Sequence, residues 1–263
     1  MNIGKIMGNA VGAAQNLTSG APKIAKTVPT SDLPVSIWDC QIPMPWEVFE
    51  AKKANYIKQL YATYFDENGK VIPEIKTFLD ETIFNLRTGG GRAERESVST
   101  IKDYIRGSIH DSDIITGTLY HGALRPEAVL AEGFNPRYIS RVNLGPGFYF
   151  AGQGEAMEYG TVIAAKIKDE GATIARANDR FYENLSGGEV SRKLGEFLGF
   201  RTDFSEEARI QSEFIPKIVN EYSRDYIVND LGIDVLSGYG GASPFDYCTC
   251  VLNPSIFEKI SRR

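Results

Sequence analysis

The chain has 263 residues, of which 29 are lysine or arginine and 34 are aspartate or glutamate, and its formal net charge is −5. Hydrophobic residues make up 42% of the chain and aromatic residues 11%, a composition that excludes collagen-like, repeat-dominated and wholly disordered proteins. The acidic balance argues against a general electrostatic footprint for nucleic acid, although it leaves room for local basic patches.

The first 44 residues differ in composition from the rest of the chain. They are rich in glycine, alanine, serine, threonine and proline, and Lys5, Lys23 and Lys26 precede the first acidic residue, Asp32. This composition predicts a flexible leader over residues 1–44.

Three amphipathic segments follow, in which apolar residues recur at helical spacing. The pattern predicts helices over residues 45–64, 73–86 and 97–109, with Pro45 suited to a first helical turn. We expect these helices to form a helical subdomain over residues 45–112.

From residue 113 the pattern alternates between strands and helices, which predicts an α+β fold. Strands are predicted over residues 116–121, 147–151, 162–167, 233–236 and 247–252. Helical segments are predicted over residues 126–132, 155–159, 189–198 and 206–230, the last with a bend at Pro216.

Cysteine and histidine usage limits the kind of site to expect. Cys40, Cys248 and Cys250 are an odd number of cysteines, which favours free thiols in a reducing compartment such as the cytoplasm. Neither His110 nor His121 lies in a metal-ligand spacing, so we expect no metal. No apolar run reaches the roughly eighteen residues that span a bilayer, so we expect a soluble chain without membrane insertion.

The first candidate functional residue is His121, in the segment Tyr120-His121-Gly122. A histidine at the end of a strand can place its imidazole beside a ligand, and the glycine after it lets the backbone approach the same ligand. A lone histidine in this position is more often structural, so this pattern does not decide the function by itself.

The second candidate is a pair of tyrosines ten residues apart. Tyr149 lies in the predicted strand Gly147-Phe148-Tyr149-Phe150-Ala151, and Tyr159 ends the following helical turn. If the chain folds back between them, a flat ring can stack between the two aromatic faces. The alternative interpretation makes both tyrosines core residues beside a glycine-rich turn.

Together these segments resemble a known enzyme family. The order Tyr120-His121-Gly122, a helix ending at Gly133, the strand with Tyr149, and then Ala156 and Tyr159 is similar to the NAD-binding half of the diphtheria-toxin and poly(ADP-ribose) polymerase class of ADP-ribosyltransferases. The resemblance covers residues 116–168 well and 230–260 loosely. It implies a split, mostly antiparallel β core over residues 113–263.

The resemblance also implies a role for each matching residue, with NAD as the substrate. His121 would hydrogen-bond the adenosine ribose, the backbone of Gly122 would hold the nicotinamide carboxamide, and Tyr149 and Tyr159 would enclose the nicotinamide ring. Ala156 belongs to the same NAD-binding set. Cleavage of the bond between nicotinamide and ribose develops oxocarbenium character, and the leaving group is already cationic, so no strong acid is required.

The chain departs from the family pattern at the catalytic acid. The family carries a glutamate at the start of a late strand, where this chain has Asp246-Tyr247-Cys248. Counting back from Asn253-Pro254 puts Cys248 in the register of the glutamate, and Asp246 lies two residues earlier on the same face. We favour Asp246 as the catalytic carboxylate. Arg137, after Gly133-Phe134, is either a ligand of an NAD phosphate or a surface arginine.

The predicted activity is therefore transfer of ADP-ribose from NAD to a macromolecular acceptor, with release of nicotinamide. Absence of the usual glutamate favours mono-ADP-ribosylation, and the acceptor is expected to be a protein rather than nucleic acid. An NAD glycohydrolase and a catalytically inactive NAD-binding or protein-interaction module are the alternatives. The leader over residues 1–44 suits a bacterial or phage effector or toxin delivered into another cell. The sequence does not indicate an oligomeric state.

Overall fold

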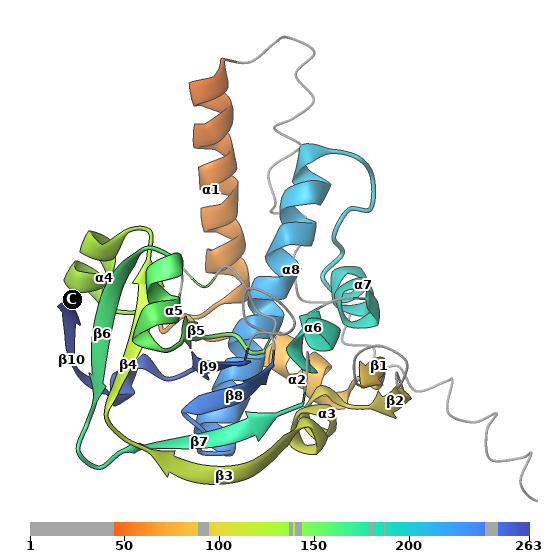
Figure 1. The fold of residues 1–263 in the computed structure, drawn as a ribbon. Coiled ribbons are helices and arrows are strands. Elements are labelled where there is room, and N and C mark those ends of the chain that lie inside the picture. The colour runs from red at the N-terminus through yellow and green to blue at the C-terminus, as the bar shows by residue number, and fades with distance from the viewer. Residues whose placement is uncertain are drawn as a thin grey trace, which may run out of the picture.

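The structure, a computed structural model, describes residues 45–88, 95–136, 139, 144–178, 181–186, 188–239 and 247–263. In this part of the chain, helices cover one face of a five-stranded sheet, and a three-stranded sheet packs against the other face (Figure 1). The predicted α+β class is thus confirmed at this coarse level.

The α-helices of the described residues are 6 to 20 residues long. Their bounds are α1 Trp46–Tyr64, α2 Pro73–Glu81, α3 Ile101–Ser108, α4 Pro126–Glu132, α5 Gln153–Glu158, α6 Phe181–Ser186, α7 Gly188–Phe197 and α8 Glu206–Asp225, followed by the π-helical segment η4 Tyr226–Asp230 and the short 3₁₀ segment η5 Pro254–Ile256. The predicted helix over residues 45–64 is confirmed, and so is the helix over residues 126–132. None of the helices in the described residues is long and apolar enough to cross a membrane.

The predicted helix over residues 73–86 is wrong in its second half. α2 ends at Glu81, and Phe84–Thr88 forms strand β1, which pairs antiparallel with β2, Arg95–Ser99. Within β1, Phe84 and Leu86 are buried and the residue between them is exposed. This period of two belongs to a strand, and it overlaps the helical spacing of the preceding apolar residues.

The third predicted helix, over residues 97–109, begins later than expected. α3 starts at Ile101, because the side chain of Thr100 accepts a hydrogen bond from the amide of Asp103 at 3.2 Å and so caps the first turn. The residues before it belong to β2, and those after it open strand β3, Ile109–Ile115.

The five-stranded sheet has the strand order β3-β7-β8-β9-β5 and the three-stranded sheet the order β10-β6-β4. The remaining strands are β4 Thr118–Ala123, β5 Phe148–Phe150, β6 Thr161–Ile167, β7 Ala172–Ala177, β8 Val235–Tyr239, β9 Tyr247–Val251 and β10 Phe257–Arg262. Only β7 and β8 are parallel among these described pairs; the others are antiparallel. The two sheets meet where β4 approaches β5, and there the amide of Ala151 donates to the carbonyl of Tyr120 at 3.0 Å.

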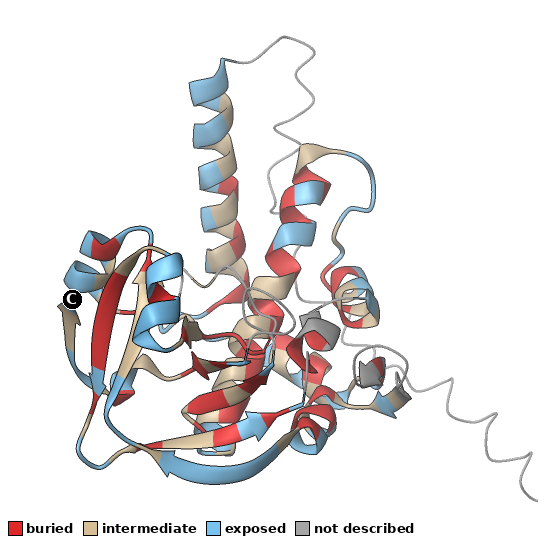
Figure 2. Ribbon diagram, in the orientation of Figure 1, coloured by how far each residue is buried: buried red, intermediate tan, exposed pale blue. Residues whose placement is uncertain are grey.

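Two buried hydrophobic clusters lie on opposite faces of the five-stranded sheet. The larger cluster joins the helices to alternate residues of the sheet, among them Leu236 and Cys250. The smaller cluster fills the space between the two sheets with the intervening residues, among them Val235 and Val251. Figure 2 shows the buried strands between these layers and the exposed outer strand β3.

The division of the chain into a leader, a helical subdomain and a catalytic domain stays a prediction. Residues 1–44 lie outside the described residues. The boundary predicted between residues 112 and 113 falls inside β3, and the larger cluster has members from Tyr56 to Leu252. The helices before and after the boundary thus share one core.

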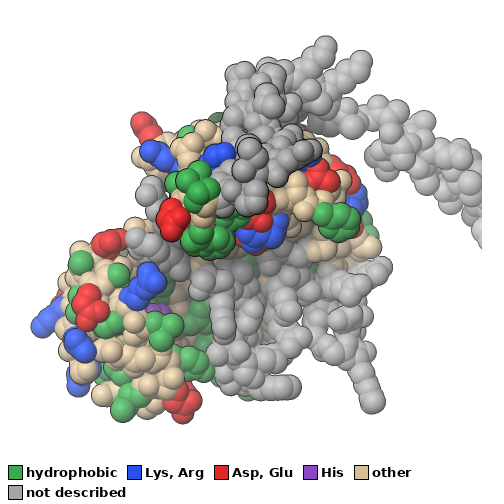
Figure 3. Space-filling view, turned by 90° about the horizontal axis from the view of Figure 1, so that it is seen from above, with side chains coloured by type: hydrophobic (Ala, Val, Ile, Leu, Met, Phe, Trp, Pro, Cys, Tyr) green, Lys and Arg blue, Asp and Glu red, His purple; other side chains and the backbone are tan. Residues whose placement is uncertain are grey.

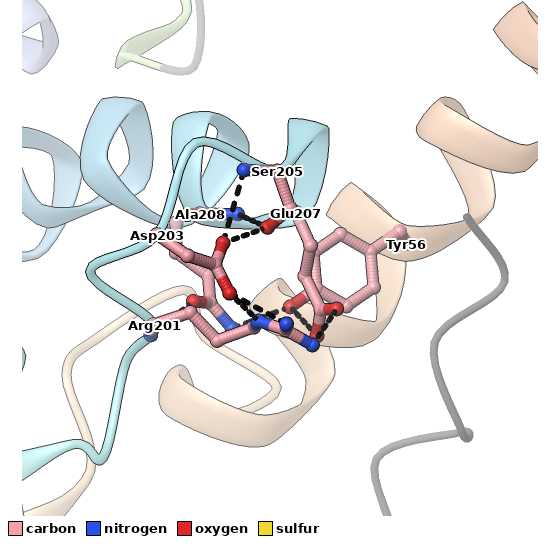
Figure 4. A network of polar contacts seen from close by, with 7 residues as sticks. Tyr56, Arg201, Asp203, Ser205, Glu207 and Ala208 are labelled. Carbon is pink, nitrogen blue, oxygen red and sulfur yellow. Dashed lines mark hydrogen bonds and ion pairs between the residues drawn. The ribbon is translucent and has the colours of Figure 1, made fainter. Parts of the chain in front are cut away.

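A buried polar network attaches α1 to α8 (Figure 4). The hydroxyl of Tyr56 donates to Oε1 of Glu207 at 3.2 Å and accepts from Nε2 of Gln211 at 2.7 Å. The side-chain oxygen of Gln211 accepts from the backbone amide of Arg201 at 2.7 Å, and the guanidinium of Arg201 lies 3.5 Å from Glu207. The charge of the buried Glu207 is therefore compensated by Arg201, in the segment before α8, and by a hydrogen bond from Tyr56 of α1.

Candidate functional site

The candidate site is built where β4, β5 and α5 meet. α5 follows β5 directly and packs on β4, and its first turn is held by the side chain of Glu155, which accepts from the amide of Gly152 at 3.2 Å. Segments that are about thirty residues apart in sequence are thus in contact.

His121 is oriented by a hydrogen bond across the junction of the two sheets. Its Nδ1 lies 2.8 Å from the backbone carbonyl oxygen of Tyr149, and because a carbonyl accepts, Nδ1 is the donor. The ring packs against Phe134 and Phe150 at centroid distances of 5.3 and 5.6 Å. Burial lowers the pKa of His121 below its usual 6.5, and the bond to Tyr149 opposes this shift. The imidazole is therefore neutral at pH 7, and its Nε2 can accept a hydrogen bond from a hydroxyl group.

Gly122 lets α5 lie directly on β4. A Cβ atom at this position would come within 2.2 Å of the carbonyl oxygen of Ala156 and 2.7 Å of the Cβ of Tyr159. Any side chain here would push α5 away from the strand, so glycine is required by the close approach. Ala156 is buried in this contact, whereas Tyr159 is 45% exposed at its edge.

The side chain of Tyr149 is fixed by the turn that precedes its own strand. Its hydroxyl accepts from the amides of Leu144 and Gly145 at 2.9 and 3.2 Å, and it donates to the carbonyl of Gly145 at 3.2 Å. Burial raises the pKa of Tyr149, so the phenol stays protonated. Its polar atom is thus occupied by the protein, and its ring packs against the larger hydrophobic cluster.

Five of the predicted residues lie at this junction, but the ring of Tyr149 packs against the larger cluster, on the face of β5 opposite to Phe150 and His121. Consecutive residues of β4 are tied to the two tyrosines: His121 bonds the backbone of Tyr149, and Gly122 contacts Tyr159 and Ala156. The chemistry at this place comprises the neutral imidazole of His121 and the half-exposed ring of Tyr159.

Of the other predicted residues, the structure describes only Cys248, which is not part of this arrangement. Arg137 and Asp246 lie outside the described residues. Cys248 is 7% exposed and belongs to the larger hydrophobic cluster, on the same strand as the fully buried Cys250. Burial raises the pKa of Cys250, whose thiol donates to the carbonyl of Gly145 at 3.5 Å. The apolar surroundings of Cys248 do not suit a residue that must carry negative charge toward a ligand.

Sequence reasoning missed the residues that support the site. Phe134 and Phe150 pack against His121, and Leu144 and Gly145 hold the hydroxyl of Tyr149. The alternation Phe148-Tyr149-Phe150 was a usable signal, because it puts the two phenylalanines on the face opposite to the tyrosine. No local signal indicated Phe134, which reaches His121 only through the fold.

Comparisons with known proteins found no matching family model, no matching curated protein and no matching solved structure.

Proposed function

We propose that the chain transfers ADP-ribose from NAD to a macromolecular acceptor and releases nicotinamide. The observation that carries this proposal is the junction of β4, β5 and α5, where His121 bonds the backbone of Tyr149 and Gly122 lies directly against Tyr159. The order and spacing of these residues resemble those of the diphtheria-toxin and poly(ADP-ribose) polymerase class, and their arrangement suits the roles that the resemblance implies.

Each group suits one part of NAD. The neutral Nε2 of His121 accepts a hydrogen bond from a ribose hydroxyl, and the backbone of Gly122 bonds the carboxamide of nicotinamide. The half-exposed ring of Tyr159 offers an apolar face to the flat nicotinamide ring, and the resemblance assigns the second stacking face to Tyr149. Burial keeps both His121 and Tyr149 uncharged, so neither repels the cationic nicotinamide ring of NAD.

The proposed reaction is a substitution at the ribose carbon bonded to nicotinamide. The bond from this carbon to the ring nitrogen breaks, and its electron pair stays on the nitrogen, so nicotinamide leaves as a neutral molecule. A nucleophilic atom of the acceptor forms the new bond and loses its proton to water. The developing positive charge on the ribose is stabilised by a carboxylate, for which we propose Asp246.

NAD affinity tests the proposal. In titration calorimetry, His121→Ala and Tyr149→Ala should each weaken NAD binding at least about tenfold, equivalent to about 1.4 kcal/mol, because each removes one contact with the ligand. Tyr149→Phe keeps the ring, so it should bind NAD within about threefold of the wild type while losing about 1–3 kcal/mol of stability from the unpaired amides of Leu144 and Gly145.

The matched control is Phe204→Ala, since Phe204 is fully exposed outside this junction. It should change neither affinity nor stability. Unchanged NAD affinity in both alanine variants of the site, with both proteins folded by circular dichroism, would contradict the proposal.

A further inference from the structure

The start of α1 carries aromatic side chains beyond the part of the helix that packs on α8. The buried residues of α1 are Tyr56, Leu60 and Tyr64, all in its second half. Trp46 and Phe49 extend the same face toward the start of the helix, because they precede Tyr56 at helical spacing. Their rings stack with centroids 5.5 Å apart and planes at 22°, and Trp46 is 68% exposed. Aromatic surface of this kind is typical of a binding surface.

This aromatic face continues past the start of α8. The pKa of Glu206, the first residue of α8, is lowered chiefly by its bond to Arg209 and in part by the nearby Lys53 of α1. α8 thus begins level with Lys53, and Phe49 and Trp46 lie about 6 and 10 Å further along the axis of α1. Figure 3 looks down on the end of the molecule toward which α1 begins, and hydrophobic side chains lie there at the surface among acidic and basic ones. The start of α1 is therefore left to another partner.

The segment just before α1 has the composition of such a partner. Residues 33–44 lie outside the described residues, and their sequence differs from the glycine-rich and alanine-rich residues before them. Asp39 is their only charged residue, and half of them have large hydrophobic side chains: Leu33, Val35, Ile37, Trp38, Ile42 and Met44. A segment of this composition and the aromatic face of α1 both gain from leaving water, and packing on each other achieves this for both.

The connection to α1 is long enough to bring this segment back to the helix. Residues 39–45 join Trp38 to Trp46, and this stretch reaches about 23 Å when extended. Trp46 and Phe49 are only about 5 Å apart along the helix axis. The covalent link also gives the segment a local concentration of about 1 mM, far above that of a second copy in dilute solution. The aromatic face therefore favours its own chain as the occupant.

We propose that residues 33–44 fold back on the start of α1, where Trp38 packs against Trp46 and Phe49. The contact continues the packing that α8 begins at Tyr56, and it attaches the segment to the folded part of the chain. The flexible leader predicted over residues 1–44 accordingly ends before Leu33. This docking is independent of NAD and of the proposed function.

The two tryptophans of the chain report on this contact directly, because both belong to it. In the full chain, Trp46→Phe leaves Trp38 as the single tryptophan, and acrylamide quenching measures how far its ring is shielded from solvent. Trp38 should be quenched less in the native chain than in the same chain unfolded in denaturant. Phe49→Ala in this background should raise the quenching toward the unfolded value. Val48→Ala is the matched control and should not, since Val48 is exposed on another side of the same helix.

A double-mutant cycle in denaturant unfolding gives a second measurement on the full chain. Trp38→Ala and Trp46→Ala should each raise the equilibrium constant of unfolding, and the coupling between them should be at least about fivefold. Trp38→Ala and Val48→Ala should show no coupling, because Val48 lies off the aromatic face.

Three outcomes overturn the inference. The first is quenching of Trp38 that is as strong in the native chain as in denaturant, with the protein folded by circular dichroism. The second is a pair of tryptophan substitutions whose effects simply multiply. The third is shielding of Trp38 that disappears on dilution as a dimer dissociates, which would assign the aromatic face to a second copy of the chain.

Discussion

His121 is fixed by one bond from Nδ1 to the backbone of β5, and this bond makes Nε2 the accepting nitrogen of the neutral ring. The surrounding aromatic rings partly bury the imidazole, and this burial lowers its pKa. The residue is thus poised to remain neutral throughout the neutral pH range.

This environment predicts a pH dependence of stability. Since the folded-state pKa of His121 is lowered, the folded protein binds fewer protons than the unfolded chain, so stability is complete above about pH 6.5 and falls as the pH drops below it. In denaturant unfolding, His121→Gln should lose less stability than the wild type between about pH 7 and about pH 5.5. His110→Gln is the control. An equal loss of stability in the wild type and in His121→Gln would show that burial does not lower the pKa of His121.

The late strand predicts a contrast between two substitutions. Asp246→Asn should lower nicotinamide release at least about a hundredfold, because the amide carries no charge to stabilise the cationic ribose. Cys248→Ser should retain most of the release, since the thiol is buried in the larger hydrophobic cluster. Enzyme kinetics that show the reverse order would assign the catalytic role to Cys248.

The sequence indicated candidate site residues where they belong to a short local motif. His121-Gly122 and the strand with Tyr149 could be recognised because glycine and aromatic residues recur at specific spacings. The bond from His121 to the carbonyl of Tyr149 could not, since it joins residues 28 apart. The anchoring of the Tyr149 hydroxyl also required the actual path of the turn before β5.

At the scale of elements, the packing of α5 on β4 holds the site together. Gly122→Ala should displace α5, because the added Cβ would overlap the carbonyl of Ala156 and the Cβ of Tyr159. We expect NAD affinity to fall at least about tenfold in calorimetry. Gly154→Ala is the matched control, since a Cβ there meets open space on the same helix. Equal affinities of the two variants would contradict a role for this contact in NAD binding.

The polar network between α1 and α8 should affect stability rather than NAD binding. Tyr56→Phe removes the hydroxyl that bonds both Glu207 and Gln211, so each of these buried groups loses a partner. The free energy of unfolding should therefore fall by about 1–3 kcal/mol. The exposed Tyr247→Phe should cost less than about 0.5 kcal/mol in the same denaturation experiment. A stability loss no larger in Tyr56→Phe than in Tyr247→Phe would show that the network does not stabilise the fold.

Helices and strands were predictable where one hydrophobic period dominated a segment and a terminating residue such as glycine followed it. α4 begins at Pro126 and ends before Gly133, as predicted. The failure over residues 73–86 arose because β1 continues the apolar spacing of α2, and only pairing with β2 separates the two elements. Strands β3, β7 and β10 were not predicted, since their pairing partners lie far away in sequence.

At the scale of the whole molecule, the larger and the smaller hydrophobic cluster lie on the two faces of the five-stranded sheet. The candidate site lies where this sheet meets the three-stranded sheet. Helices α1 to α3 contribute residues to the larger cluster. We therefore expect the helices to support the sheet that carries Tyr149, while NAD contacts come from β4, β5 and α5.

Incubation of the full chain with NAD labelled in its adenylate half, in the presence of a cell lysate, tests the proposed transfer of ADP-ribose. We expect release of nicotinamide and transfer of the label to protein. Both should be lost in His121→Ala and retained in Phe204→Ala. Label found only in free ADP-ribose would identify an NAD glycohydrolase instead. No nicotinamide release from the folded wild-type chain would contradict the account.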